Sequence, residues 1–139
     1  MVGRARPPKV YSGAMGIRIK RIYDDAAEDD GRRVLVDRLW PRGVSTERAH
    51  LDVWLKEVAP SPALRTWWNH DPSRLDEFAV RYRAELDDDP ATVEALAQLR
   101  GIAAHGPTTL LYAARDSRVN HARILADYLA DHPADDTSA

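Results

Sequence analysis

The residues best suited to chemistry follow a short apolar run at residues 34–36, of the kind that forms a buried strand. Directly after it stand Asp37, Arg38, Trp40 and Arg42. In α/β proteins, ligands bind at the carboxyl ends of strands, where surface loops rest on a rigid sheet. An arginine fork grips a carboxylate or phosphate, and an indole offers a flat face to a ring. These residue types predict a site for a small anionic or nucleotide-like molecule.

A second polar cluster spans the step from the last predicted strand into the last predicted helix. It consists of Arg115, Asp116, Asn120 and His121. Asp116 or Ser117 is expected to cap the helix, which places Asn120 and His121 in the first turn. Free N–H groups and the positive end of the helix dipole attract anions there. An unperturbed histidine titrates near neutral pH, so His121 is the histidine best placed for proton transfer.

Together the two clusters predict one site. The catalytic candidates are Asp37 and His121, and the ligand-binding candidates are Arg38, Trp40, Arg42, Tyr112, Arg115, Asp116 and Asn120. Each also has a structural interpretation. Asp37 and Arg38 could pin their loop through ion pairs while Trp40 fills the core, because ion pairs also gather at strand ends. His121 could be a hydrogen-bonded helix residue that orients Asp116 or a backbone carbonyl.

Three apolar segments predict the strands that position these clusters. Residues 17–22 alternate between isoleucine and basic residues, as a half-buried strand does. Residues 34–36 and 108–113 are apolar or β-branched and predict buried strands. The strands at 34–36 and 109–112 should be parallel neighbours, because the helices between them supply the crossover that parallel pairing needs.

Helical spacing and capping signals predict about five helices. Leu51, Trp54, Leu55 and Val58 fall on one helical face, which predicts a helix that ends before Pro60. Three more helices begin where a capping side chain precedes a proline, at Ser61-Pro62, Asp71-Pro72 and Asp89-Pro90. The last helix is expected from about residue 118 to 130.

Helices that alternate with apolar strands predict a single-domain α/β fold with a small, mainly parallel sheet flanked by about five helices. Residues 1–14 and 131–139 lack apolar periodicity and are predicted to be disordered tails around a domain at 15–130. The pattern leaves open whether translation starts at Met1 or Met15.

Composition disfavours several classes of function. The 139 residues contain no cysteine, which excludes disulfides, thiolate nucleophiles and cysteine-ligated metals. Five histidines without paired helical spacing, and the lack of Walker and dinucleotide patterns, predict neither a metal nor a cofactor. The net charge of -2 argues against bulk attraction to nucleic acid or a membrane surface. No segment has transmembrane length, so a cytoplasmic protein is expected.

Several separated motifs occur in order between Met15 and about Leu129. They are KRIYD at 20–24, VLVDRLWPRG at 34–43, WLKEVAPS at 54–61, Leu64-Arg65, Tyr82 with Glu85-Leu86, LLYAARD at 110–116 and Asn120-His121-Ala122. This combination resembles the YeaO-like family, a bacterial domain-of-unknown-function group. The resemblance implies a small cytoplasmic α/β protein and little about mechanism. Where such relatives often carry lysine, this chain has Arg115, which keeps the charge and changes the hydrogen-bonding geometry.

Three functional interpretations stay open. The pocket between the loop after Val36 and the start of the last helix predicts a small-molecule-binding protein that, as an enzyme, would be a metal-independent hydrolase or transferase. A non-catalytic sensor would use the same arginines and Trp40 without moving a proton. A nucleic-acid-associated module would use Trp40, Arg42, Arg65 and Trp67, and the acidic net charge weighs against it. The expected partner is a small anionic molecule, and the ligand's identity and the oligomeric state are left open.

Overall fold

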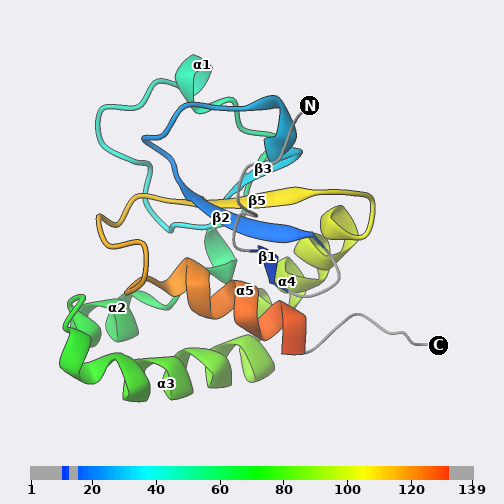
Figure 1. Ribbon diagram of the computed structural model, residues 1–139. Coiled ribbons are helices and arrows are strands. Elements are labelled where there is room, and N and C mark those ends of the chain that lie inside the picture. Colours follow the sequence, from blue (N-terminus) through cyan, green and yellow to red (C-terminus); the bar gives the residue numbers. More distant parts are fainter. Residues whose placement is uncertain (1–10, 13–15, 132–139) are drawn as a thin grey trace.

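A parallel sheet forms the centre of the protein in a computed structural model, which describes residues 11–12 and 16–131 (Figure 1). The strands of this described part are β1 (Tyr11–Ser12), β2 (Ile17–Arg21), β3 (Arg32–Leu35), β4 (Val53–Trp54) and β5 (Thr108–Tyr112). Their order is β1-β2-β5-β3-β4. All neighbours pair in parallel except β1 and β2, which are antiparallel. The predicted α/β fold with a small, mainly parallel sheet is confirmed.

β5 lies between β2 and β3, and each of its five residues is buried. Such a position requires apolar or β-branched residues on both faces, as the segment TTLLY provides. Val34 of β3 lies opposite Leu110 of β5 in parallel register. The prediction that these two strands are parallel neighbours is therefore confirmed, and their carboxyl ends meet at the same edge of the sheet.

Helices cover the two faces of the sheet unequally. The α-helices of the described part are α1 (Thr46–Ala49), α2 (Pro62–Trp68), α3 (Leu75–Asp88), α4 (Pro90–Ala103) and α5 (His121–Asp131). In the view of Figure 1, α2, α3 and α5 lie below the sheet, whereas the short helix α1 and its loops lie above it. The described residues also form the short 3-10 helices η2 (Glu28–Asp30), η3 (Lys56–Val58) and η4 (Pro72–Arg74). None of the helices in the described residues is long and apolar enough to cross a membrane.

The three predicted capping signals work as expected. The side chain of Ser61 accepts a hydrogen bond from the Leu64 amide at the start of α2, and Asp89 accepts one from the Thr92 amide in α4. Asp71 accepts one from the Ser73 amide, although its first turn is the 3-10 helix η4, which leads directly into α3. Each proline stands where a helix has no need of its N–H group.

The helix predicted for residues 51–58 is wrong. This segment forms β4 followed by η3, and Trp54 lies opposite Leu35 in parallel register. The Leu55 amide donates to the Leu35 carbonyl at 2.9 Å, and the Asp52 amide donates to the Arg33 carbonyl at 2.9 Å. Pairing with the otherwise open edge of β3 satisfies backbone groups of both segments, and this tertiary gain outweighs the helical spacing of the apolar residues.

Both ends of the predicted domain also differ in detail. Tyr11 and Ser12, assigned to the N-terminal tail, pair as β1 with the edge of β2. The edge of β2 offers unpaired N–H and C=O groups, which explains why residues of low hydrophobicity can add a strand there. α5 ends at Asp131, one residue beyond the expected boundary. The remaining tail predictions, for residues 1–10, 13–14 and 132–139, lie outside the described residues.

The main core is formed by the sheet together with helices α2, α3, α4 and α5. Its largest fully buried side chains include Trp68, Phe78 and Tyr82, whose rings stack in sequence. A smaller apolar cluster on the other face includes Leu35 and Leu111. The strands thus bury alternate residues on opposite faces, and the smaller cluster supports the loop that follows β3.

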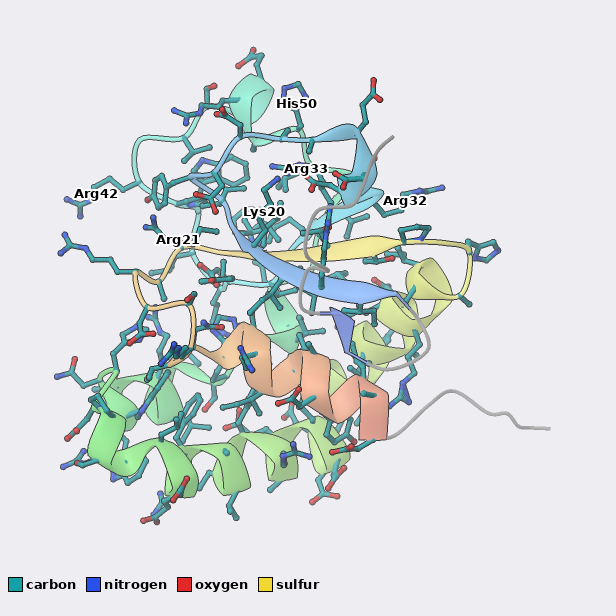
Figure 2. All side chains as sticks on the ribbon, in the orientation of Figure 1. Lys20, Arg21, Arg32, Arg33, Arg42 and His50 are labelled. Atoms are coloured by element: carbon teal, nitrogen blue, oxygen red, sulfur yellow. The ribbon has the colours of Figure 1, made fainter. Side chains whose placement is uncertain are left out.

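A buried charge cluster also lies in the sheet, and sequence patterns gave no sign of it. Asp30 is 1 % exposed and receives charge-assisted hydrogen bonds from Arg18 at 2.9 Å, Lys20 at 3.1 Å and Arg33 at 2.5 Å. The Thr109 hydroxyl donates to the Asp30 carbonyl at 2.7 Å. Asp30 therefore joins β2 and β3 through its carboxylate and β5 through its backbone carbonyl. Figure 2 shows Lys20 and Arg33 on the same side of the sheet.

The turn that carries Asp30 into β3 requires glycine. Gly31 has a φ of 66°, and a Cβ at this position would lie 2.1 Å from the Pro107 carbonyl oxygen. We expect Gly31→Ala to lower the free energy of unfolding by about 1–3 kcal/mol, because it adds backbone strain to a steric overlap. Urea denaturation measures this loss, with Gly43→Ala as control because a Cβ at Gly43 would meet nothing within 4 Å. Equal effects of both variants would contradict the steric explanation.

Candidate functional site

A pocket of about 320 Å³ opens at the carboxyl ends of β3 and β5. Its lining comes from the loop after β3, the segment after β5, helix α2 with the turn that follows it, and the first residue of α5. The loop after β2 also contributes to it. The polar and aromatic lining residues include Tyr23, Asp37, Arg38, Trp40, Arg42, Arg65, His70 and His121. The pocket lies where the parallel strands β3 and β5 end.

Asp37 lies at the base of this pocket. Its Oδ2 accepts a hydrogen bond from the Ala113 amide at 2.9 Å, which ties the loop after β3 to the end of β5. Its Oδ1 is buried and has no hydrogen-bond partner within the described residues. The nearest cationic or titratable atom is Nε2 of His121, at 3.3 Å from Oδ1. A buried carboxylate oxygen without a hydrogen bond lowers the free energy of unfolding, because its hydration is lost without replacement. Most buried polar atoms in proteins do have a partner, so the Asp37–His121 pair differs from the surrounding core.

His121 is fixed by a backbone carbonyl. Its Nε2 lies 2.8 Å from the Val36 oxygen, and a carbonyl oxygen can only accept, so this contact assigns the proton to Nε2. The same N–H points near Asp37. In the neutral imidazole Nδ1 then carries the lone pair. The ring of Tyr82 packs edge-on against the imidazole with centroids 6.1 Å apart, which holds the ring plane.

Burial perturbs the titration of both groups. It raises the pKa of Asp37 against the opposing charge of His121 and the hydrogen bond from the Ala113 amide. It lowers the pKa of His121, although Asp37 and the Val36 carbonyl favour the protonated ring. Desolvation disfavours the charged form of each group. At neutral pH the imidazole is therefore uncharged, with a proton on Nε2 and a free lone pair.

Arg38 contacts the protein itself rather than facing the pocket with a free guanidinium. It donates to the Pro60 carbonyl at 3.2 Å and the Ala59 carbonyl at 3.1 Å, and it pairs with Glu57 at 3.0 Å. These bonds hold the loop after β3 against the start of α2. The geometry agrees with the structural interpretation of Arg38, in which the residue pins its loop.

Trp40 and Arg42 line the mouth of the pocket. The Trp40 indole donates to the Val44 carbonyl at 2.7 Å and packs edge-on against Trp54 at 5.3 Å between centroids, so its ring is held in place. Arg42 is exposed, and no side-chain partner for it is present in the described part of the chain. Figure 2 shows Arg42 extending from its loop at the periphery of the molecule. The Tyr23 hydroxyl donates to the Arg42 carbonyl at 2.9 Å and steadies the loop.

Sequence reasoning did not assign Arg65 and His70 to this pocket. Arg65 lies on α2, is exposed, and has no side-chain bond within the described residues. His70 follows α2 in a left-handed turn with a φ of 54°. Their positions depend on how α2 packs against the strand ends, which local periodicity does not reveal. The one available signal was Leu64-Arg65 among the family-like motifs.

Trp67 and Trp68 both pack against other side chains of the protein. Trp68 is 1 % exposed, stacks on Phe78 at 3.9 Å between centroids, and donates to the Asp71 carbonyl at 2.9 Å. Trp67 is covered by the guanidinium groups of Arg74 and Arg81, at 5.0 and 4.4 Å from its ring centroid. One indole therefore belongs to the core, and the other is covered by neighbouring arginines.

The second predicted cluster does not converge on the pocket as a whole. Arg115 and Asp116 line a separate hollow beside it, and Tyr112 faces a groove on the other side of β5. Asn120 is fully buried, and its side chain accepts from the Arg123 amide at 2.9 Å and donates to the Asp116 carbonyl at 2.9 Å. Of this cluster, His121 alone is among the residues that line the pocket.

The predicted cap of the last helix is also wrong. α5 begins at His121, and Asn120 caps it, whereas Asp116 accepts from the Arg118 and Val119 amides in the preceding turn. These two amide bonds lower the pKa of Asp116. Both residues are common caps, and the sequence placed the helix start too early because Asp116 closes a turn of its own.

Metal ligands are not gathered in the described residues, where no group of three or more histidine and acidic side chains could hold a metal ion. The chemistry that the pocket residues offer is anion binding by guanidinium groups and proton exchange at the Asp37–His121 pair.

Comparisons with known proteins place the chain in a family. The family described as the inactive DUF488-N3 subclade matches residues 16–139. The chain is 44% identical to the uncharacterized protein YeaO of Escherichia coli over 115 residues, which cover 83% of this chain and 97% of that protein. It is also 44% identical to the uncharacterized protein Rv3073c of Mycobacterium tuberculosis over 113 residues, 81% of this chain and 92% of that one. No solved structure matches. The chain belongs to the YeaO-like family, within the subclade described as inactive DUF488-N3.

Proposed function

We propose that this protein binds a small anionic ligand in the pocket between residues 37–42, α2 and the start of α5. The observation that carries the proposal is the presence at one pocket mouth of two arginines, Arg42 and Arg65, without side-chain partners in the described residues. Arginine is the side chain best suited to planar recognition of carboxylate and phosphate groups.

Local charge supports an anionic ligand although the whole chain is acidic. Arg38, Arg42 and Arg65 line the pocket, and Asp37 is the acidic residue among its lining side chains. The charge of Arg38 is offset by Glu57, which leaves the two remaining arginines to bind a ligand. Guanidinium groups in a concave site attract anions more strongly than the same groups on a flat surface.

The apolar part of the lining favours a ligand that also carries a ring or a flat hydrophobic group. Trp40 is fixed by its bond to Val44, and Leu39 beside it is 60% exposed. A volume of about 320 Å³ falls at the lower end of the range for small-molecule sites. A nucleotide-like or aromatic carboxylate ligand meets both conditions. The proposed setting is the cytoplasm, with which a chain lacking cysteine is consistent.

Arginine variants test this binding function directly. After a thermal-shift screen of nucleotides and aromatic carboxylates, we expect Arg42→Ala and Arg65→Ala each to weaken binding of the best ligand by about 1.5–3 kcal/mol, as loss of a charge-assisted contact does. Isothermal titration calorimetry measures the affinities. Arg83→Ala is the matched control, because Arg83 pairs with Asp131 on α5, away from the pocket.

Two results would contradict the proposal. Either no anion in the screen stabilises the wild-type protein, or the two pocket variants bind the ligand as tightly as Arg83→Ala does. A lower melting temperature without loss of affinity would assign Arg42 and Arg65 a purely structural role.

A second candidate function is acid–base chemistry that needs no metal, as in a hydrolase or transferase. The observation that favours it is the buried, unpaired Oδ1 of Asp37 at 3.3 Å from His121 Nε2. A carboxylate beside a neutral imidazole supplies two groups that can accept or donate a proton. The word "inactive" in the description of the matching family weighs toward the binding function.

A further inference from the structure

A second groove lies on the opposite side of β5 from the pocket described above. It has a volume of about 390 Å³ and runs along the outer edge of β2, between the loop after this strand and the start of α5. Its polar lining includes Arg21, Asp24, Asp29, Tyr112, Ser117 and Arg123. The pocket at Asp37 shares none of these residues.

Tyr112 supplies the first sign of a ligand site. The residue is 2 % exposed, yet its hydroxyl has no hydrogen-bond partner in the described part of the chain. This hydroxyl is not among the fully buried unpaired atoms, so it is reached from the groove that the residue lines. Burial raises the pKa of Tyr112, which keeps the phenol protonated and able to donate. A phenol whose hydroxyl bonds to no protein acceptor is available to an acceptor that enters the groove.

Two arginines line the groove together with Tyr112. Arg21 is held by its Nε bond to the Ala114 carbonyl at 2.8 Å and by the ring of Tyr23, 4.9 Å from its centroid. Arg123 lies in the first turn of α5 and has no side-chain bond within the described residues. The charges of Arg21 and Arg123 favour the ionised phenol of Tyr112, whereas those of Asp24 and Asp116 disfavour it. Figure 2 shows Arg21 at the carboxyl end of β2.

The charge balance of the groove favours an anion on the side that faces α5. Arg18 and Lys20 also line the groove, but both form ion pairs with the buried carboxylate of Asp30. Their charges are therefore offset within the protein. Asp29 pairs with Arg18 at 3.1 Å. Asp24 is then the acidic lining residue that faces Arg21 and Arg123, and no ion pair between Asp24 and either arginine is present among the described residues.

We propose that this groove binds the tetrahedral oxyanion of a small phosphorylated or sulfated molecule. Tyr112 donates one hydrogen bond from the floor, Arg21 and Arg123 donate from two sides, and the Ser117 hydroxyl lies at the rim. The three main donors come from β5, β2 and α5, so the fold itself positions them. The groove exceeds the size of a phosphate ion and leaves room for the rest of a metabolite. This site is independent of the function proposed for the Asp37 pocket.

Titration of the full chain with inorganic phosphate at constant ionic strength tests the proposal by two-dimensional NMR. We expect saturable shifts of the backbone signals of Ser117 and Arg123. Tyr112→Phe, which removes one oxygen atom, should weaken this binding by about threefold to tenfold, and Arg123→Gln by about tenfold or more. Arg32→Gln is the matched control, because Arg32 is exposed at the opposite end of the sheet.

The outcomes separate the two sites. Signals of residues 37–43 report the Asp37 pocket, and those of residues 117–123 report the groove. Binding that is weakened equally by all three substitutions, or not weakened by Tyr112→Phe and Arg123→Gln, would overturn the proposal. Shifts that grow linearly with phosphate and never saturate would do the same. A variant whose spectrum without phosphate differs throughout has an altered fold. In that case the phosphate affinity of the other groove variant tests the proposal.

Discussion

Replacing Asp30 by asparagine is expected to lower the free energy of unfolding by about 3–5 kcal/mol, the usual cost of removing one partner from a buried ion pair. The side chain of Asp30 is fully buried, and those of Arg18 and Arg33 are 4% and 5% exposed. Asparagine has the same shape but no charge, so two guanidinium groups would stay buried without a counter-charge from this position. Their desolvation is then uncompensated.

The neighbouring residue provides a matched control. Asp29 also pairs with Arg18, at 3.1 Å, but its side chain is 49% exposed. We expect Asp29→Asn to cost less than about 1 kcal/mol, because water screens an exposed ion pair. Urea denaturation followed by tryptophan fluorescence measures both variants. Similar losses for the two substitutions would show that total charge, rather than burial of Asp30, determines the stability of this region.

Acid should lower the free energy of unfolding of the wild-type protein, as the Asp30 substitution does. Burial raises the pKa of Asp30, but hydrogen bonds from the Ala27 amide, Lys20 and Arg33 outweigh it, and the net pKa is lowered. The unfolded chain therefore takes up the proton first. The stabilisation is complete above the ordinary aspartate pKa of 3.8 and is lost as the pH falls below it. Asp30→Asn should reduce this part of the acid sensitivity.

The sequence predicted those features that depend on local pattern. The run at 34–36 is apolar, as expected for a segment buried on both faces of the sheet, and β3 does lie inside the sheet. The change to polar residues at Asp37 marks the end of this strand, which ends at Leu35. Proline after Ser61, Asp71 and Asp89 marked three helix starts, since a cap and a missing N–H group are local requirements. Strand order then brought Asp37 and His121 to the same edge.

Features that depend on tertiary contact were not predictable in this way. Residues 53–54 form a strand only because β3 presents an open edge to them. Arg65 and His70 reach the pocket through the packing of α2, and the partners of Asp30 lie up to twelve residues away on β2 and three residues away on β3. No periodic signal encodes such pairings, because each element satisfies its own pattern without them.

One segment connects the two ligand sites proposed above. The peptide after β5 is bound on one side by Asp37, which accepts from the Ala113 amide, and on the other by Arg21, which donates to the Ala114 carbonyl. A ligand that moves either side chain changes the hydrogen bonding of the same short segment. The positions of both sites therefore depend on two side chains. One is Asp37, which the sequence predicts to be catalytic, and the other is Arg21, which the sequence predicts to lie in a strand.

For the second candidate function, His121→Asn is the decisive substitution. If the pocket performs acid–base chemistry, turnover should fall by about 10²–10⁴-fold, the usual contribution of a positioned acid or base. Affinity for the ligand should stay within about tenfold, because a neutral hydrogen bond is worth about 0.5–1.5 kcal/mol and about 1.4 kcal/mol corresponds to a tenfold change. Assays with para-nitrophenyl phosphate and para-nitrophenyl acetate, together with the ligand found by the screen, measure turnover. His105→Asn is the control, since His105 is exposed and bonds to the Gly101 carbonyl away from the pocket.

The pH dependence of turnover separates His121 from other proton carriers. Burial lowers the pKa of His121, so the neutral ring persists into mildly acidic solution and activity that uses it as a base should persist with it. Activity lost with an apparent pKa above that of free imidazole would assign the proton to another group. If the wild-type protein forms no product and His121→Asn changes only affinity, the pocket binds its ligand without reaction, as the family description "inactive" would have it. In that case the imidazole serves to hold Asp37 and the Val36 carbonyl at the base of a binding site.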